Sequence, residues 1–402
     1  MVRSIFSGLS DVEKKWKQDV GEVLKVELAP HVDAIERGEK EIIDVVKALG
    51  KHGYCGVTFP QKLGGLGLPI RHELILSEAI ASYSLPVDMS RLSGSYPAML
   101  ARMFGKTRDL KELVEGLVKG EKIGAFCFTE PDAGSDLSRM TTIAERDPGS
   151  GDFLLTGEKR FITNGSVADV LVVYARNGAF IIESKWKGFE VIEEYTMMGL
   201  HGLHLGHLKF DHVPVPAKNA LFYQEIKAGS EHARSGKTSA IASLQDMLSP
   251  ERVALSVQAL GVAKTALETA IAYSQQRVQF NRPIAEFEGI SFKLAEMATK
   301  YEAACSLVEK SVQTMQNGTR AAMAKLCACQ AAFEICDDAL EVLGGIGYTT
   351  KYPVERCLRD VRLLRIGGGT DEIMKYVIQK GIFKGDLDRE DAQSDGGRSL
   401  FG

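Results

Sequence analysis

The chain contains no long apolar run and no paired cysteine motif, and each absence excludes a class of protein. No stretch of the 402 residues approaches the roughly 20 apolar residues that a helix needs to cross a bilayer, so we expect no membrane anchor. The seven cysteines include no Cys-x-x-Cys pair, which argues against a disulfide scaffold and against structural zinc. We expect them to be reduced, buried side chains: Cys55, Cys127, Cys305, Cys327, Cys329, Cys336 and Cys357.

The chain also lacks a charge excess and the usual nucleotide-binding glycine motifs. Its 49 basic and 53 acidic residues give a net charge of −4, which leaves no basic footprint for nucleic acid. Neither Gly64 to Gly67 nor Gly345 to Gly347 completes the Gly-x-Gly-x-x-Gly of a Rossmann site, and no Gly-Lys-Ser/Thr closes a Walker loop. The first seven residues lack the features of a secretory signal, so we expect a cytoplasmic protein.

A histidine-rich stretch, which includes His201, His204, His207 and His212, raises the question of a zinc site. The spacings between these histidines are odd, and on a strand an odd spacing places successive side chains on opposite faces. We therefore expect no metal site.

The period of the apolar residues divides the chain into helical, β-rich and helical parts. With 45% hydrophobic and 25% charged residues the chain can bury large cores and should form two or three domains. We expect an α+β multidomain protein with an N-terminal helical domain at 1–121, a middle β domain at 122–235, a C-terminal bundle of four helices at 236–385 and a flexible tail at 386–402. The expected N-terminal helices are 12–27, 41–50, 72–84, 96–104 and 110–119, and the expected strands include 153–155, 170–174 and 180–182.

The C-terminal part returns to a helical period after a segment of loop composition at 225–243. The expected bundle helices are 250–277, 288–316, 320–343 and 371–383. Ser249 fits an N-cap and Pro250 a first helical position, and a carboxylate at Glu251 is then favoured by the helix dipole. On position alone this structural interpretation of Glu251 is the stronger one, because a first-turn glutamate is common and rarely catalytic.

Three segments together resemble the acyl-CoA dehydrogenases, flavoenzymes that remove an α proton and a β hydride from an acyl thioester. They are CFTEPDAGSD at 127–136, LSPER at 248–252 and RIGGGTDEI at 365–373. The resemblance extends from about Gly53 to Phe383. It implies a β-barrel between two helical domains, bound FAD and an oligomer, usually a tetramer.

The resemblance also places the catalytic base. Most family members carry it in the loop before the last helix, where this chain has only glycines, whereas isovaleryl-type and long-chain-type members carry it in a Glu-Arg pair that Glu251-Arg252 matches. Glu251 is therefore expected to be the base, with Arg252 orienting or tuning it. Gly368 is expected to donate its N–H to the thioester oxygen together with a ribityl hydroxyl of the flavin. The implied substrate contacts are Ser135, Ser249, Arg252 and Gly369.

The resemblance further implies the cofactor contacts. The flavin contacts are Phe126, Phe128 and Thr129, with Phe161 and Thr163 from GEKRFITNG at 157–165. The remaining implied contacts, which include elements that reach the FAD of a neighbouring subunit, are Arg277, Phe280, Glu341, Gly344, Gly345, Thr370 and Glu372. The chain departs from the family at Glu288 and Glu341, where glutamine is common. A carboxylate cannot donate a hydrogen bond and repels phosphate, so FAD binding should be weakened unless these acids pair with a cation.

The expected activity is FAD-dependent α,β-dehydrogenation of a saturated acyl-CoA to a trans-2-enoyl-CoA, with electrons passed to an electron-transfer flavoprotein. A flavin oxidase or monooxygenase of the same fold, and a non-catalytic paralogue that acts as a binding protein, are the alternatives. The retained Glu251 disfavours both. The sequence does not indicate the length or branching of the acyl chain.

Overall fold

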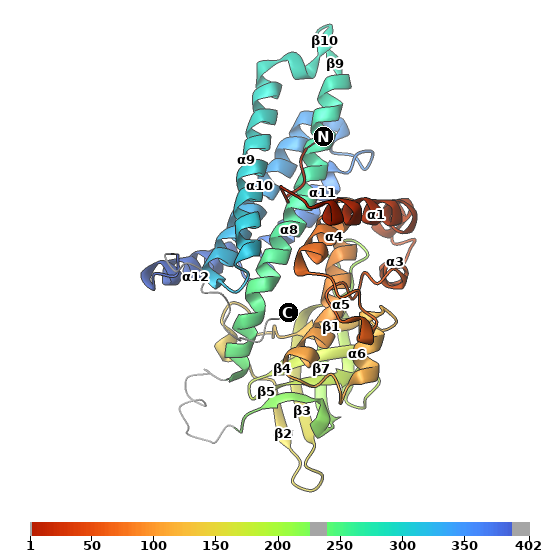
Figure 1. The fold of residues 1–402 in the computed structure, drawn as a ribbon, viewed down its shortest axis with the longest axis vertical. Helices are drawn as coiled ribbons and strands as arrows, with labels where there is room; N and C mark the ends of the chain where they lie inside the picture. The colour runs from red at the N-terminus through yellow and green to blue at the C-terminus, as the bar shows by residue number, and fades with distance from the viewer. Residues whose placement is uncertain (1, 226–238, 388–402) are drawn as a thin grey trace.

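The computed structural model describes residues 2–225 and 239–387, and it has the expected order of helices, sheets and helices. The molecule is elongated, with the long C-terminal helices towards one end and the β-rich part at the other (Figure 1). The N-terminal helices pack beside the middle of the long helix α8. Residues 226–238, most of the expected connection, and residues 388–402 of the expected tail lie outside the described part.

The N-terminal helices largely follow the prediction, with one correction. The helices are α1 (Asp11–Glu27), α2 (Val32–Glu36), α3 (Ile42–Lys51), α4 (Ile70–Tyr83), α5 (Leu85–Met103) and α6 (Lys111–Val118). The expected start of α5 at residue 96 was wrong, because the helix already begins at Leu85 and continues through Pro97. Its first half is rich in polar residues, but Arg91 is buried there and pairs with Glu73 of α4, so tertiary contacts override the weak local propensity.

The β-rich part contains two four-stranded sheets. In the first, ordered β1-β4-β5-β8, β1 (Gly124–Cys127) runs parallel to β4 (Val170–Ala175), while β5 (Gly178–Glu183) and β8 (Ala220–Tyr223) complete it with antiparallel pairs. The second is antiparallel, ordered β2-β3-β7-β6, with bounds Ile143–Arg146, Phe153–Thr163, Leu205–Val215 and Phe189–Glu194. The strands predicted around 153, 170 and 180 are confirmed.

Strand β4 is buried on both faces, which fixes how the β-rich part sits on the helices. Val170, Val172 and Tyr174 belong to a core shared with residues of α5 and α6. Leu171 and Val173 face a second core formed with strands of the other sheet. A continuous apolar run is what a strand buried on both sides requires.

The C-terminal helices are more numerous than predicted, and the first of them is longer. They are α8 (Ser239–Gln276), α9 (Glu288–Gln313), α10 (Gly318–Leu343), α11 (Val354–Leu364) and α12 (Asp371–Phe383), with the short pair β9 (Val278–Gln279) and β10 (Arg282–Pro283) between α8 and α9. The assignment of Ser249 and Pro250 to a helix N-terminus was wrong. Helix α8 begins at Ser239, inside the segment expected to be a loop, and Pro250 lies in its interior. Proline gives up one backbone hydrogen bond there, but the flanking turns remain helical.

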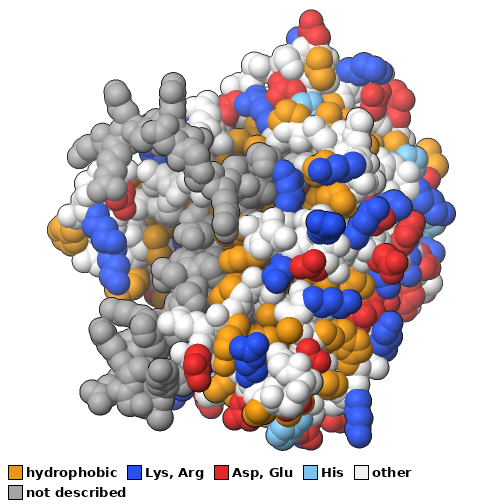
Figure 2. All heavy atoms as spheres, turned by 60° about the horizontal axis from the view of Figure 1, so that its bottom comes forward, with side chains coloured by type: hydrophobic (Ala, Val, Ile, Leu, Met, Phe, Trp, Pro, Cys, Tyr) orange, Lys and Arg blue, Asp and Glu red, His pale blue; other side chains and the backbone are white. Residues whose placement is uncertain are grey.

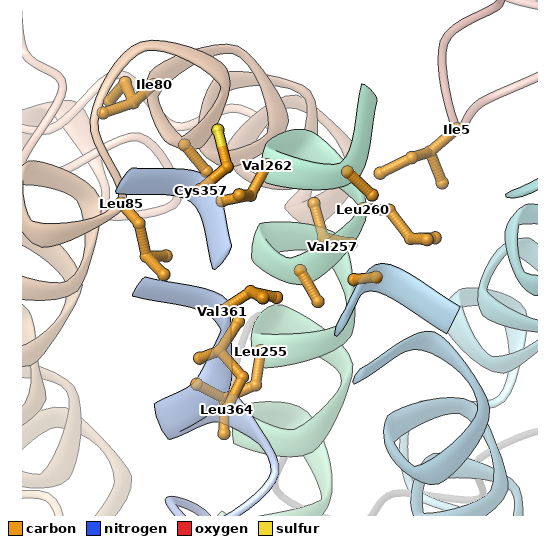
Figure 3. Close-up of a cluster of buried hydrophobic side chains, with 14 of the residues drawn as sticks. Ile5, Ile80, Leu85, Leu255, Val257, Leu260, Val262, Cys357, Val361 and Leu364 are labelled. Carbon is orange, nitrogen blue, oxygen red and sulfur yellow. The ribbon is translucent and has the colours of Figure 1, made fainter. Parts of the chain in front are cut away.

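Helix α11 was not predicted from the sequence. Its packing positions the glycine-rich loop that follows it. Its apolar side chains recur at helical spacing and are buried, but arginines separate them in the sequence. Figure 3 shows Val361 and Leu364 of α11 pointing towards Leu255 of α8 within the main core. This contact fixes the glycine-rich loop after α11 against the middle of α8.

A fully buried ion pair ties the start of the β-rich part together and gives a prediction for stability. The Lys159 Nζ lies 2.7 Å from Glu130 Oε1, with side-chain exposures of 0% and 2%. Lys159→Met leaves that carboxylate without its cation, so we expect a loss of about 3–5 kcal/mol in the free energy of unfolding, measured by urea denaturation. Lys209→Met, on the exposed side of β7, should change it by less than about 0.5 kcal/mol. A loss under about 1 kcal/mol for Lys159→Met would contradict the prediction.

The surface shows no segregation of charge on the face seen from the β-rich end. Figure 2 shows basic and acidic side chains interspersed there, with apolar patches between them. Within the described residues, no helix combines the length and the apolarity that a bilayer span requires. All seven cysteines are free, and all are buried except the partly exposed Cys327.

Candidate active site

A largely apolar pocket lies between helices α4, α5 and α8, and Glu251 lines it. The pocket encloses about 610 Å³ of empty space, part of which is open to solvent. Ala254 and Met247 also reach it from α8, whereas Ser249 and Arg252 of the same helix do not line it. Apolar and aromatic side chains predominate among the other residues of the wall: Cys55, Val57, Thr58, Phe59, Ile70, Glu73, Leu74, Ser77, Leu92, Ser95, Tyr96, Met99, Pro250 and Met315.

The pocket changes the acid–base character of Glu251. Burial raises the pKa of its carboxyl from 4.5 to about 7, and the nearby cations Arg252 and Lys325 act in the opposite direction. A carboxylate with a pKa near neutrality is poised to accept a proton at physiological pH. The position in an apolar pocket is thus suited to proton abstraction from a weakly acidic carbon.

The glycine-rich loop lies against the same turn of α8, 116 residues away in the sequence. Arg252 Nε donates to the Gly368 carbonyl at 3.5 Å, and Lys325 Nζ donates to the Gly369 carbonyl at 2.5 Å. Gly368 has a φ of 64°, in the left-handed region, and a Cβ there would lie 2.4 Å from Leu255 Cδ1. Within residues 2–225 and 239–387 no group accepts a hydrogen bond from the Gly368 N–H. A backbone donor therefore remains available in the loop that Arg252, the residue after Glu251, contacts.

The residues that follow the loop begin the last helix. Thr370 is the N-cap of α12, where its hydroxyl oxygen accepts from Ile373 N at 3.3 Å. Asp371 is buried and pairs with Arg365 at 2.7 Å. Glu372 points outward, with its side chain 79% exposed and 3.9 Å from Lys375. The cap and the ion pair hold the loop at its far end.

The two segments predicted to contact the flavin lie together in the β-rich part. Lys159 Nζ donates to the Phe128 carbonyl at 3.1 Å, and Arg160 N donates to the Thr129 carbonyl at 2.9 Å. Phe126 packs against the pocket residue Tyr96, with 5.2 Å between ring centroids. The first segment therefore adjoins the pocket directly.

The second segment presents an exposed aromatic ring. Phe161, at the end of β3, is 55% exposed and has a φ of 56°. Its ring lies 5.1 Å from that of Tyr195 and beneath the guanidinium of Arg160. Thr163 ends the strand and is half-buried, while the predicted substrate contact Ser135 is exposed in the loop after β1. A planar group that covered Phe161 would remove an apolar face from water.

The residues predicted for the neighbouring subunit's FAD lie at the opposite end of the molecule. Phe280 is 87% exposed at the turn between β9 and β10, and Arg277 directly precedes β9 (Figure 1). Gly344 and Gly345 follow the end of α10. In one chain the structure does not bring these residues together with Phe161 and Thr129.

The two departures from the family pattern, Glu341 and Glu288, differ in their surroundings. Glu341 pairs with Lys293 at 2.8 Å, so its negative charge is compensated by a cation, although not by Arg277. Lys293 also pairs with Asp338 at the same distance. Glu288 is exposed at the start of α9.

Sequence reasoning missed two residues beside Glu251. Lys325 is fully buried in α10, and a lysine within the stripe Ala321, Ala324, Ala328 was the signal that could have identified it. Tyr96 lines the pocket from α5, and burial, with Glu251 next, raises the pKa of its hydroxyl well above the usual value. No pattern distinguished Tyr96 from an ordinary core aromatic.

The histidines of the β-rich part pair with carboxylates rather than with one another. His204 contacts Glu194 and Glu41, and His207 contacts Glu158. His201 and His212 contact Glu36 and Asp211. Within the described residues no three histidine, cysteine or carboxylate side chains are grouped to hold a metal ion.

Comparison with known proteins agrees with this arrangement over most of the chain. Models of the acyl-CoA dehydrogenase N-terminal, middle and C-terminal domains match residues 10–121, 125–213 and 241–383. An acyl-CoA dehydrogenase of Bacillus subtilis is 36% identical over 383 residues, which cover 91% of this chain and 96% of the relative.

Solved structures of similar proteins give the same result. Butyryl-CoA dehydrogenase of Megasphaera elsdenii is 32% identical with a TM-score of 0.84, and the match covers 94% of this chain and 100% of that one. An acyl-CoA dehydrogenase of Bacillus anthracis in complex with FAD is 26% identical with a TM-score of 0.84, covering 96% of this chain and 70% of that one. The sequence matches and the fold together establish that this chain belongs to the acyl-CoA dehydrogenase family.

Proposed function

We propose that the protein is an FAD-dependent acyl-CoA dehydrogenase in which Glu251 removes the α proton of a saturated acyl-CoA. The observation that carries the proposal is the buried Glu251 carboxyl next to Arg252, which contacts the loop where the Gly368 N–H has no acceptor among the described residues. The N–H would bind the thioester oxygen as it gains charge, and Arg252 would hold the loop through the Gly368 carbonyl. The product is a trans-2-enoyl-CoA.

The β-rich part offers surfaces that fit FAD. Phe161 is an exposed aromatic ring held in an unfavourable backbone conformation, which fits a site that a planar ligand covers. Thr129 and Thr163 would supply hydroxyls to the flavin, and Phe126 and Phe128 pack between Thr129 and the pocket residue Tyr96. FAD, when bound, supplies the acceptor for the β hydride.

The remaining assignments follow from the family. Arg277, Phe280, Gly344 and Gly345 would contact the FAD of a neighbouring subunit, which requires an oligomer, and a homotetramer is the expected form. Exposed Ser135 would contact the coenzyme A arm, and an electron-transfer flavoprotein would receive the electrons. Thr370, Glu372 and Glu341 stay proposed cofactor contacts, and Ser249 and Gly369 proposed substrate contacts.

Anaerobic titration tests the proposed function. The purified protein should be yellow with bound FAD and should be bleached by at least one saturated acyl-CoA from a panel of different lengths and branching. Enoyl-CoA should form in proportion to the flavin reduced. Oxygen consumption without an added acceptor would instead indicate an oxidase, and a colourless protein that cannot bind FAD would indicate a non-catalytic paralogue.

The pH dependence of flavin reduction should report the ionisation of Glu251. The base acts only when it is ionised, so kcat/KM should rise with pH and reach half of its plateau near pH 7, where the pKa of the carboxyl lies. Below that pH the rate should fall about tenfold per pH unit, because the ionised fraction does. A pH-independent rate between pH 5 and 8 would contradict the assignment.

Replacement of Lys325 tests whether the pH dependence of kcat/KM reports the pKa of Glu251. The Lys325 ammonium lowers the pKa of Glu251, so Lys325→Met should move the midpoint to higher pH. Lys300→Met, on α9 and paired with Glu334, should leave the midpoint in place.

A further inference from the structure

A buried network of one cation and two carboxylates lies behind the wall of the pocket. Arg91 of α5 is 2% exposed, and its Nη2 contacts Glu73 Oε1 at 2.5 Å and Asp88 Oδ1 at 2.7 Å. Arg91 also donates from Nη1 to the Tyr54 carbonyl at 2.7 Å and from Nε to Asp88 at 3.0 Å. Four of the five N–H groups of Arg91 are therefore used within this network.

The two carboxylates of this network differ in how fully they are hydrogen-bonded. Asp88 is fully buried and also accepts from Ser77 Oγ and from Gln258 Nε2. Glu73 lines the pocket with Glu251, and its only hydrogen-bond partner among the described residues is Arg91, which reaches Oε1. Oε2 of Glu73 is thus an acceptor on the pocket wall without a partner in that part of the chain.

The network also gives the pocket wall a net negative charge. The charges of Glu73, Asp88 and Arg91 sum to −1. Oε2 of Glu73 is accessible in the pocket and is not sealed in the protein. A bound acyl chain that covers it without supplying a donor removes its hydration and gives nothing in return, which is unfavourable. Nothing in the proton abstraction at Glu251 calls for a second carboxylate in the same pocket.

We propose that the acyl group of the substrate carries a hydroxyl or another uncharged hydrogen-bond donor, which Glu73 binds from α4 while Glu251 acts on the α carbon from α8. This inference rests on the proposed function and specifies its substrate class. An unsubstituted acyl chain would leave Oε2 of Glu73 desolvated and unpaired. An acyl chain that ends in a carboxylate, such as glutaryl, would add repulsion to that loss.

Matched pairs of substrates test the proposal by flavin reduction in the full-length protein with bound FAD. The panel contains butyryl-, valeryl- and hexanoyl-CoA, their 4-, 5- and 6-hydroxy counterparts, and glutaryl-CoA. For at least one pair the hydroxylated compound should have a kcat/KM higher by about tenfold to a hundredfold, as a hydrogen bond to a charged group provides. Glutaryl-CoA should be the poorest substrate of its length.

Variants of Glu73 show whether this preference comes from its carboxylate. Glu73→Gln keeps an oxygen for Arg91 but removes the negative charge and turns an amide donor towards the pocket, so discrimination against glutaryl-CoA should fall at least several-fold. Glu73→Leu should abolish the preference for hydroxylated chains and leave unsubstituted chains as the better substrates. Glu78→Gln is the matched control, because Glu78 is a buried carboxylate of α4 that does not line the pocket.

The outcomes separate this inference from the proposed function. If no acyl-CoA reduces the flavin, the proposed function fails and this inference fails with it. If unsubstituted chains reduce the flavin as well as or better than every hydroxylated partner, this inference alone fails. If Glu73→Leu does not retain FAD, the test uses Glu73→Gln instead. The measured quantity is then the ratio of kcat/KM for glutaryl-CoA to kcat/KM for valeryl-CoA. A ratio equal to that of the wild-type protein would overturn the role of Glu73.

Discussion

Glu251→Gln is expected to slow flavin reduction by a good acyl-CoA substrate by about 10²- to 10⁴-fold, the range that a positioned general base contributes. Glutamine has nearly the same shape, but its amide cannot accept the α proton. The variant should keep bound FAD and the same absorbance spectrum, because Glu251 lines the pocket between α4, α5 and α8 and not the surface beside Phe161. Stopped-flow absorbance under anaerobic conditions measures the rate.

Glu302→Gln is the matched control for this experiment. Glu302 lies on α9, and its side chain is 50% exposed in a surface pair with Arg3. Such a pair contributes little to stability, so the control should react at the wild-type rate. A Glu251→Gln protein that keeps more than about a tenth of the wild-type rate would remove Glu251 from the role of base.

Gly368→Ala is the second replacement with a large expected effect. The new Cβ would lie 2.4 Å from Leu255 Cδ1 at a residue whose φ of 64° disfavours any side chain. The Leu255 side chain can rotate away, but the strained backbone should displace the N–H that faces the thioester oxygen. Loss of one such donor lowers kcat by about 10²- to 10³-fold, and single-turnover flavin reduction is the measurement.

The neighbouring glycine offers the control. A Cβ at Gly367 meets only the Leu363 carbonyl, at the ordinary distance of 3.7 Å, and its φ lies outside the left-handed region. Gly367→Ala should therefore retain the wild-type rate to within about threefold, since it neither strains the loop nor moves the donor. Equal losses in both variants would show that the loop tolerates no side chain, and would not support a special role for the Gly368 N–H.

Local sequence patterns were sufficient to predict an element or a site residue where a single apolar period or a single motif determines it. Apolar spacing predicted the long helices α9 and α10, and the continuous apolar run at Val170 to Tyr174 predicted the buried strand β4. The match of Glu251-Arg252 to the family pattern singled out a residue that the structure places in a pocket. These features depend on neighbours a few residues apart, which a sequence displays directly.

Patterns failed where distant contacts outweigh local preference. Ser249 and Pro250 have the composition of a helix start, yet α8 begins at Ser239. The first half of α5 is polar and was not predicted as a helix, but Arg91 is buried there in a pair with Glu73 of α4, and Asp88 accepts from Gln258 of α8. Local propensities amount to less than about 1 kcal/mol per residue, and packing exceeds them.

By itself, the sequence determined the order of helices and strands, the family and the identity of the acid in the Glu-Arg pair. Only the tertiary structure decided that this acid is buried near Lys325, that Gly368 contacts the adjacent Arg252, and that Glu73 shares the pocket of Glu251. The reason is physical. The pKa of a carboxyl and the availability of a donor depend on groups brought close in space from helices far apart in the chain, and no local period records their proximity.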